Sequence, residues 1–264
     1  MQAATLPFSS GWLWIQEGAG IFKRQPMAMF FWSLITGFLI TIAYLIPLLG
    51  QMALIAAMPI LTFITLNACR NIVANRTMMP GMWLAPLHDI QARRSLVRLG
   101  LVYLVICLLG GLVATLPFLD NLMAAVGADG TISQQDLAGA IRGPFVVFGV
   151  LYLLISALFW HAPALMGWHR IKLAQALFYS MVACWRNKWP FLLYGASWGL
   201  IFLAVQLAGN MLVAMGLGTG VVQLILTPVN LIIAAILYCS FYPTYMSVFG
   251  DSYSTQPTDD AANG

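Results

Sequence analysis

The sequence has very little charge. Only 8% of its 264 residues are Asp, Glu, Lys or Arg, whereas 61% are hydrophobic. A soluble domain usually carries about 25% charged residues, and a folded globule of this length exposes more surface than so few charges can cover. Hydrocarbon as the surrounding medium removes this conflict, because apolar side chains can then face outward. The shortage of charge therefore excludes a soluble globular protein and favours a membrane protein.

Arrangements of residues for metal binding, disulfide bonding or catalysis are also missing. The four cysteines form no CxxC pair, and each lies in or beside an apolar run, as small buried hydrophobic residues do. The three histidines show no HExxH spacing, and the sequence has no GxSxG motif or P-loop. The positive charges lie in short segments between apolar runs rather than on one basic face. We therefore expect no cofactor, no metal and no nucleic-acid partner.

Long apolar runs are what the sequence does have. A membrane-spanning helix needs about 20 mostly apolar residues, and a transmembrane barrel would instead show alternating segments of about 10 residues. Six runs meet the first requirement: Met27–Ile46, Gln51–Cys69, Leu99–Leu119, Pro144–Leu165, Pro190–Leu217 and Val221–Val248. We predict an all-α polytopic membrane bundle in which six transmembrane helices form three hairpins, within a single transmembrane domain over residues 1–250.

The positive residues predict the orientation of the chain. Arg142 falls on one side of a six-span arrangement, and all other basic residues fall on the opposite side: Lys23, Arg24, Arg70, Arg76, Arg93, Arg94, Arg98, Arg170, Lys172, Arg186 and Lys188. Lys and Arg are enriched in cytoplasmic loops, so both termini are expected in the cytoplasm. Residues 251–264 are rich in Ser, Thr, Asp, Ala and Asn, which predicts a disordered cytoplasmic tail.

A short cytoplasmic segment precedes each hairpin. Ser10–Gln25 and Lys172–Lys188 have apolar residues at helical spacing, and Leu87–Arg98 is basic. Trp residues beside Lys and Arg suit the headgroup region of a bilayer, which predicts amphipathic interfacial pre-helices. The alternative is that these segments cap the bundle. Each even-numbered span also contains proline, and we expect Pro163 to bend the fourth span.

A few polar side chains in or near the apolar runs are candidate ligand-binding residues: Gln51, Gln206, Asn210, Asn230 and His161. With Gln223, the amides could line a cavity that opens to the outside. They could instead form hydrogen bonds between helices, worth about 0.6 kcal/mol each. The imidazole of His161 is either a proton site or a structural group near the membrane surface.

Gly195 and Gly199 are four residues apart in the fifth run and therefore share one face of its helix. This GxxxG spacing permits close approach of another helix. Packing against a helix of the same chain is expected, because a six-helix bundle has many internal contacts.

Basic residues just before the first and fifth runs are candidate ligands for lipid headgroups. One pair is Lys23 and Arg24, and the other is Arg186 and Lys188. Each Lys or Arg near an anionic membrane surface contributes about 1 kcal/mol to binding. The same residues also orient the chain, so the pattern alone does not separate the two roles. The bilayer and its anionic lipids are the expected partners.

Four stretches resemble a family of uncharacterised bacterial inner-membrane proteins: GWLWI and IFKRQP within residues 11–26, IPLLG at 46–50, HAPALM at 161–166, and AQALFYSMVACWRNKWPFL at 174–192. The unit of pre-helix, basic residues, proline and span is also distantly similar to the membrane domain of some glycerophosphodiester phosphodiesterases. That similarity does not extend to their soluble catalytic domain, so it implies no such activity. The family resemblance implies a location in the bacterial inner (cytoplasmic) membrane.

These patterns favour a non-enzymatic inner-membrane protein that acts as a scaffold or binds lipid, with a membrane-protein partner or a second copy of the chain as further candidate partners. The alternative is a transporter or channel for a small molecule or lipid, favoured by the proline-containing spans, the repeated hairpin unit and the outer amides. A membrane enzyme is a third hypothesis, and it would require a carboxylate facing His161 in a water-filled cavity.

Overall fold

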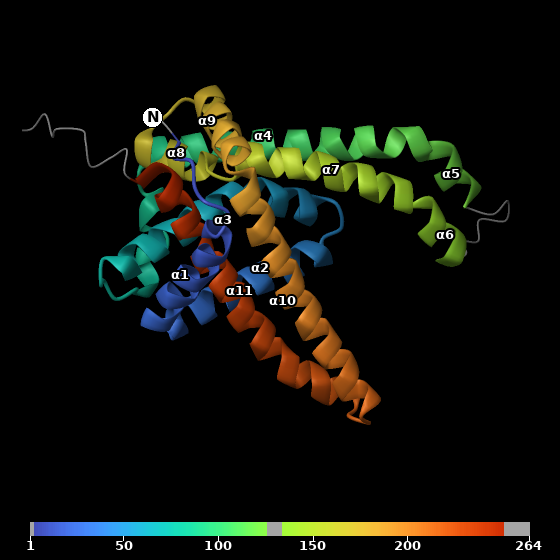
Figure 1. The fold of residues 1–264 in the computed structure, drawn as a ribbon. Coiled ribbons are helices and arrows are strands. Elements are labelled where there is room, and N and C mark those ends of the chain that lie inside the picture. Colours follow the sequence, from blue (N-terminus) through green and yellow to red (C-terminus); the bar gives the residue numbers. More distant parts are fainter. Residues whose placement is uncertain (1–2, 126–133, 251–264) are drawn as a thin grey trace, which may run out of the picture.

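The computed structural model describes residues 3–125 and 134–250. All regular elements within them are helices, and six helical segments are long and apolar enough to cross a membrane. The helices pack in pairs as three hairpins (Figure 1): α2 (Pro26–Leu45) with α3 (Leu49–Val73), α4 (Ile90–Thr115) with α7 (Arg142–Phe159), and α10 (Lys188–Ala214) with α11 (Thr219–Phe249). The predicted all-α polytopic bundle is thus confirmed for these residues.

Shorter helices connect and cap the hairpins: α1 (Ser10–Arg24), η1 (Pro80–Met82), η2 (Ala85–Leu87), η3 (Leu116–Phe118), α5 (Leu119–Ala124), α6 (Gln134–Ala140), α8 (Ala162–His169) and α9 (Leu173–Arg186). The predicted tail, residues 251–264, lies outside the described residues. The division of the chain into one transmembrane domain and a tail stays a prediction.

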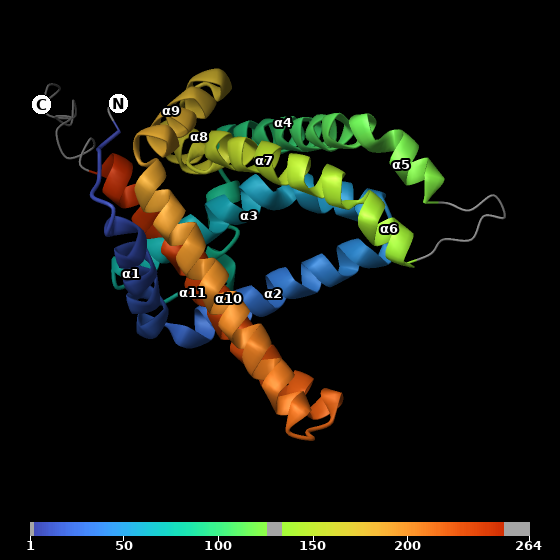
Figure 2. The ribbon, with the colours of Figure 1, turned by 45° about the vertical axis from the view of Figure 1, so that its right-hand side comes forward.

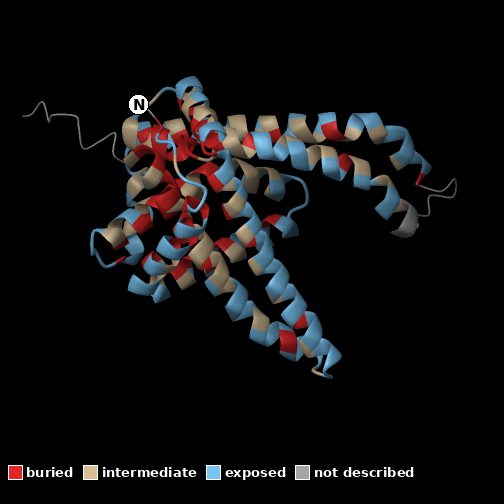
Figure 3. Ribbon diagram, in the orientation of Figure 1, coloured by how far each residue is buried: buried red, intermediate tan, exposed pale blue. Residues whose placement is uncertain are grey.

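The three hairpins converge at one end and diverge at the other (Figures 1 and 2). We call the convergent end the hub; it consists of α1, α8, α9 and the adjoining ends of the six long helices. Buried residues gather there (Figure 3), and the largest include Trp14, Met29, Leu66, Leu99 and Leu165. The hub is the end to which sequence analysis assigned all basic residues except Arg142, which begins α7 far from the hub. Which compartment the hub faces stays a prediction.

Helix α1 lies against α10 and α11. Its apolar face is buried in the chain, where the indole of Trp14 donates a hydrogen bond to Ser247 Oγ at 2.8 Å and packs on Phe191. Trp12 and Leu13 on the outer face remain exposed. One side of α1 therefore caps the bundle, and the other side keeps the aromatic and apolar residues that suit the membrane surface.

Helix α4 runs without interruption from the basic segment into the third span. The Asp89 side chain caps its first turn, accepting hydrogen bonds from the backbone N–H groups of Gln91 at 2.8 Å and Ala92 at 3.4 Å. The hydrogen bond from Gln91 lowers the pKa of Asp89 most. The Ala92 hydrogen bond and the Arg170 guanidinium, 3.3 Å from the carboxylate, lower this pKa further. The prediction of a separate second pre-helix over Leu87–Arg98 was therefore wrong, because nothing breaks the helix between its cap and the span.

The fourth span is not one bent helix. α7 ends at Phe159, and Pro163 lies in the first turn of a separate helix, α8, where its missing N–H has no cost. Ser180 of α9 fixes the break, because its hydroxyl accepts a hydrogen bond from the His161 N–H at 3.0 Å and donates one to the Ala157 carbonyl at 2.8 Å. The prediction that Pro163 bends a continuous helix was wrong.

Candidate functional site

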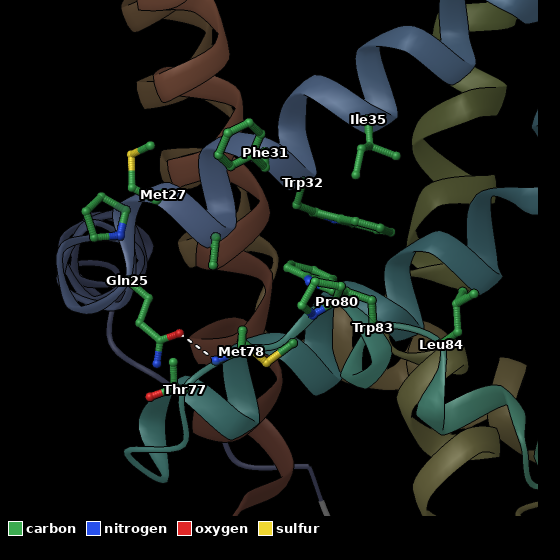
Figure 4. Close-up of a pocket in the computed structure, with 12 residues that line it drawn as sticks. Gln25, Met27, Phe31, Trp32, Ile35, Thr77, Met78, Pro80, Trp83 and Leu84 are labelled. Atoms are coloured by element: carbon green, nitrogen blue, oxygen red, sulfur yellow. Dashed lines mark hydrogen bonds between the residues drawn. The ribbon is translucent and has the colours of Figure 1, made fainter.

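A cleft of about 790 Å³ opens between the first turns of α2 and the segment 77–84 that precedes α4. Its walls are almost entirely apolar, and we call it the Trp32–Trp83 cleft after its two largest side chains. The two indoles stack with ring centroids 4.5 Å apart and planes inclined by 14° (Figure 4). Trp32 is held in place by the hydrogen bond that its Nε1 donates to Thr65 Oγ1 at 2.8 Å. The cleft therefore has one rigid aromatic wall.

Gln25 ties the loop after α3 to the junction of α1 and α2. Its Oε1 accepts a hydrogen bond from the Met78 N–H at 2.9 Å (Figure 4), and its Nε2 donates one to the Arg76 carbonyl at 2.7 Å. Arg24 makes a third connection, donating a hydrogen bond to the Val73 carbonyl at 3.3 Å. These bonds bring the far end of the loop over the start of α2, which creates the cleft.

The cleft has an apolar lining, and two basic residues that do not line it directly precede it in the chain. Lys23 and Arg24 form the last turn of α1, directly before Gln25 in the lining, and both are exposed. Met27, Phe31 and Ile35 line the cleft along α2 and are more than half exposed. This arrangement matches an amphipathic molecule with an anionic head and apolar chains.

A second space, the central cavity, has a volume of about 530 Å³ and lies where the three hairpins converge. Residues from α2, α3, α4, α7, α8 and α11 line it, and none of them is charged. Most of its polar side chains carry hydroxyls, including a Tyr103–Tyr152 pair with oxygens 3.3 Å apart and a Tyr238–Thr36 pair at 3.4 Å. The cavity can therefore accept an uncharged, hydrogen-bonding group within the membrane-spanning part of the chain.

His161 is almost completely buried in the hub. Its imidazole meets three aromatic rings, those of Phe191, Tyr245 and Phe249, at centroid distances of 5.9, 5.9 and 5.2 Å. Neither ring nitrogen has a hydrogen-bond partner within the described residues. The carboxylate that a membrane enzyme at this site would need is not among these neighbours. The aromatic surroundings favour a structural role for His161.

The five candidate amides lie on two hairpins. Gln51 is in the first hairpin, whereas the other four are in the third hairpin, and all five side chains are exposed. Gln206 donates a hydrogen bond from Nε2 to Asn210 Oδ1 at 3.4 Å. None of the five lines the Trp32–Trp83 cleft or the central cavity.

The second basic pair lies apart from the Trp32–Trp83 cleft. Arg186 ends α9 and donates a hydrogen bond to Thr5 Oγ1 at 2.9 Å. The Lys188 ammonium lies over the rings of Trp185 and Trp189, 5.1 and 5.9 Å from their centroids. Both indoles are exposed, which is the arrangement expected for side chains in the headgroup region. This pair has access to lipid headgroups but lines neither the Trp32–Trp83 cleft nor the central cavity.

Gly195 and Gly199 do not pack within the chain. Among the described residues, no atom outside the glycine's chain neighbours and its own helix backbone lies within 4 Å of the position that a Cβ would occupy at either residue, and both glycines are exposed. The prediction of intramolecular packing was wrong because α10 meets α11 along a different face, which contains Gly209.

Sequence analysis missed the role of the loop between α3 and α4. Trp83 and Met78 line the cleft from this loop, but in the sequence they stand in a short stretch whose apolar residues are interrupted by Pro80 and Pro86 and show no helical spacing. The sequence gives only a weak indication that Gln25 has a structural role, namely its position directly before the proline that begins α2. Its partners lie far along the chain, so its function depends on tertiary contacts.

Comparison with known proteins agrees with a membrane location. The chain is 29% identical over 262 residues to a probable inner membrane protein of Burkholderia thailandensis, and the alignment covers 95% of this chain and 94% of that protein. This chain is an integral membrane protein. The full-length similarity also supports a relation to inner-membrane proteins without an assigned activity. No family model matches the chain, and no solved structure matches it. The similarity to the phosphodiesterase membrane domain stays a prediction.

Proposed function

We propose that this integral membrane protein is a non-enzymatic component of the bacterial inner membrane that binds an anionic phospholipid in the Trp32–Trp83 cleft. The observation that supports this most directly is that Lys23 and Arg24 directly precede Gln25, a lining residue of an apolar cleft whose opening residues are exposed along α2. The head of the lipid would contact the two cations, and one acyl chain would lie against Trp83 and Phe31.

Charge would give this site its selectivity. Acyl chains are surrounded by hydrocarbon before and after binding, so the apolar walls contribute shape and dispersion contacts rather than hydrophobic transfer energy. Each basic residue near an anionic headgroup contributes about 1 kcal/mol. Removing both charges should therefore weaken binding by a factor of about 30, since each 1.4 kcal/mol corresponds to tenfold.

Native mass spectrometry of the full chain can test this proposal, with phosphatidylglycerol and phosphatidylcholine offered in equal amounts. We expect the parent to retain phosphatidylglycerol preferentially, and the double variant K23Q/R24Q to lose that preference. The matched control is R186Q/K188Q, which removes the same charge from a surface without a cleft. Equal loss in both double variants, or no preference in the parent, would contradict a site at the cleft.

A scaffolding function would use the same end of the molecule. A lipid bound at the cleft, together with exposed α9 residues such as Phe178 and Trp185, would present a surface to a membrane-protein partner or to a second copy of the chain.

A second candidate function is transport of a small molecule or lipid. The central cavity favours it, because an uncharged space with several hydroxyl groups lies between the hairpins at the level of the membrane-spanning helices. Flux measurements in proteoliposomes, comparing the parent with Tyr103→Phe, which removes one of the hydroxyls that line the cavity, test this candidate. Equal flux in protein-free vesicles would leave lipid binding as the function.

A further inference from the structure

One face of α11 connects the central cavity to the far end of the third hairpin. The residues on this face follow each other at intervals of three or four: Gln223, Thr227, Asn230, Ala234, Tyr238, Phe241 and Tyr245. Side chains at such intervals lie in one stripe along a helix. The last three line the central cavity, and the first three are exposed. The wall of the cavity thus continues outward as an uncharged polar stripe.

Polar residues of α10 lie on the same side of the hairpin. The position of a Cβ at Gly209 would be 2.6 Å from Leu226 and 3.9 Å from Val222, so these residues mark where α10 faces α11. Around the axis of α10, Gln206 and Asn210 lie about 60° and 100° from Gly209. Around the axis of α11, Gln223 lies about 100° from Val222, in the same direction when each helix is followed from its N-terminus. In two antiparallel helices, side chains that are rotated in this way from the line of contact point to the same side of the pair. The three amides therefore lie on one side of the third hairpin.

Two glycines extend this side of α10 toward the hub. Gly199 is two helical turns before Gln206 on the same face, and Gly195 lies one further turn away. Nothing fills the space beside either residue. The α10 part of this side is therefore open at Gly195 and Gly199 among the described residues. Nearer the hub, α2 packs against α11, where Ser33 Oγ donates a hydrogen bond to the Leu231 carbonyl at 2.9 Å. In addition, this hairpin diverges from the α4–α7 hairpin (Figure 2).

The stripe is long enough to cross the hydrocarbon of a bilayer. From Gln223 to Tyr245, an α-helix rises about 33 Å at 1.5 Å per residue, whereas the hydrocarbon core is about 30 Å thick. Amides exposed to hydrocarbon are unfavourable unless they form hydrogen bonds. Groups that can satisfy them over this distance are water and the polar heads of lipids, which reach this face sideways from the bilayer.

We propose that this face is a track along which phospholipid headgroups cross between the two leaflets while their acyl chains stay in the hydrocarbon. The track carries no charged residue among those named, so it suits zwitterionic or neutral heads, and movement would be passive and in both directions. Asn230, Thr227 and Gln223 would exchange hydrogen bonds with the passing head beyond the central cavity. This inference rests on the second candidate function, transport, and is independent of lipid binding at the Trp32–Trp83 cleft.

A dithionite assay on reconstituted vesicles can test the track. The full chain is placed in phosphatidylcholine vesicles containing a small fraction of fluorescent phosphatidylcholine, and dithionite bleaches only probes in the outer leaflet. In protein-free vesicles, dithionite removes about half of the fluorescence. We expect it to remove more than half in vesicles that contain the parent chain. The triple variant Q223L/T227V/N230L should slow the second half of bleaching at least tenfold.

Two controls make the result decisive. The triple variant Q223N/T227S/N230Q keeps hydrogen-bonding groups at the same positions and should retain the parent rate of bleaching. Thr41→Val removes an exposed hydroxyl from the first hairpin, away from the proposed track, and should also retain the parent rate. Elution volume and thermal unfolding report whether each variant is folded. Parent vesicles that bleach only by half, or a folded Q223L/T227V/N230L that bleaches like the parent, would overturn the track. Disulfide-linked dimers of Asn230→Cys without lipid movement would also overturn it, by showing that a second copy covers this face.

Discussion

The hub and the far ends of the hairpins are built from similar apolar residues but are packed very differently. In the hub, large side chains such as Trp14, Met29 and Leu165 are almost completely buried. Toward the far ends, side chains such as Leu207, Met211 and Leu224 are more than half exposed (Figure 3). In a membrane both environments are apolar, so packing and hydrogen bonds rather than burial from water must hold the hub together.

This difference separates two tasks. Tight packing in the hub fixes where the helices begin, and with it the geometry of the Trp32–Trp83 cleft. The diverging hairpins leave their inner faces accessible to lipid, and they have fewer contacts that resist bending. Substitutions in the hub should therefore affect folding, whereas substitutions at the far ends should affect lipid interactions. The following predictions are ordered from the largest expected effect to the smallest.

The largest effect is expected for Trp14→Ala. The substitution removes a side chain that is 2% exposed, its hydrogen bond to Ser247 and its contact with Phe191. Removing a buried Trp typically costs about 3–5 kcal/mol of unfolding free energy. Thermal unfolding in detergent should show a large decrease in the midpoint. Trp12→Ala, two residues away with 46% exposure, is the control and should change the midpoint little; equal decreases would contradict the packing of α1.

A smaller effect is expected for adding one methyl group to the hub. A Cβ at Gly18 of α1 would lie 2.7 Å from the Cα of Ser240 in α11, so Gly18→Ala should destabilise the protein by about 1–3 kcal/mol. Gly199→Ala makes the same change where no atom is within 4 Å. This variant should be neutral or gain up to about 1 kcal/mol from helix propensity. Thermal unfolding of both variants side by side measures the contrast.

Thiol labelling should also distinguish the two regions. Burial raises the pKa of Cys184 in α9 to about 12, so its thiol stays protonated at pH 7.5 and should react slowly with a maleimide. All four native cysteines are buried, which makes the parent suitable for single added cysteines. A cysteine introduced at Gly218, in the turn of the third hairpin, should react within minutes. Rapid labelling of Cys184 in the folded parent would contradict the packing of the hub.

The smallest effect concerns acid stability. The pKa of Asp89 is lowered, first by the Gln91 N–H bond and further by the Ala92 N–H and Arg170. A lowered carboxyl pKa contributes stability that is present above the pKa of the unfolded chain and is lost as the pH falls through the folded value. The unfolding midpoint of the parent should therefore decrease below pH 4. Asp89→Asn keeps an acceptor for the cap without the charge, so this part of the decrease should disappear; an unchanged pH profile would exclude Asp89 as its source.

The spans were predictable because their signal is local. Each run, such as Met27–Ile46, contains enough consecutive apolar residues to specify a membrane helix without reference to the rest of the chain, and α2 begins within a residue of that prediction. The break at His161 was not predictable, because it depends on hydrogen bonds from Ser180. The break also places His161 among aromatic rings that come from α10 and α11.

The candidate site was predictable only in its charges. Lys23 and Arg24 stand out in the sequence because they precede a span. The apolar part of the cleft cannot be recognised in the sequence, because Trp32 and Trp83 come together only when Gln25 anchors the loop between α3 and α4. Gln206 and Asn210 are four residues apart, so they share one helix face, and they form a hydrogen bond, but the orientation of that face depends on the contact at Gly209.

The central claim is that the packed hub holds hairpins whose far ends remain apart in the bilayer. Pulsed electron spin resonance on the protein in nanodiscs measures this directly, with spin labels on cysteines introduced at Leu119 and Gly218, near the ends of the second and third hairpins. We predict long and broad distances between these labels, and a narrow distribution for a pair in the hub at Gln16 of α1 and Gln175 of α9. A short, narrow distance between the far ends, close to the 8–10 Å typical of packed helix axes, would show a closed bundle and contradict the account.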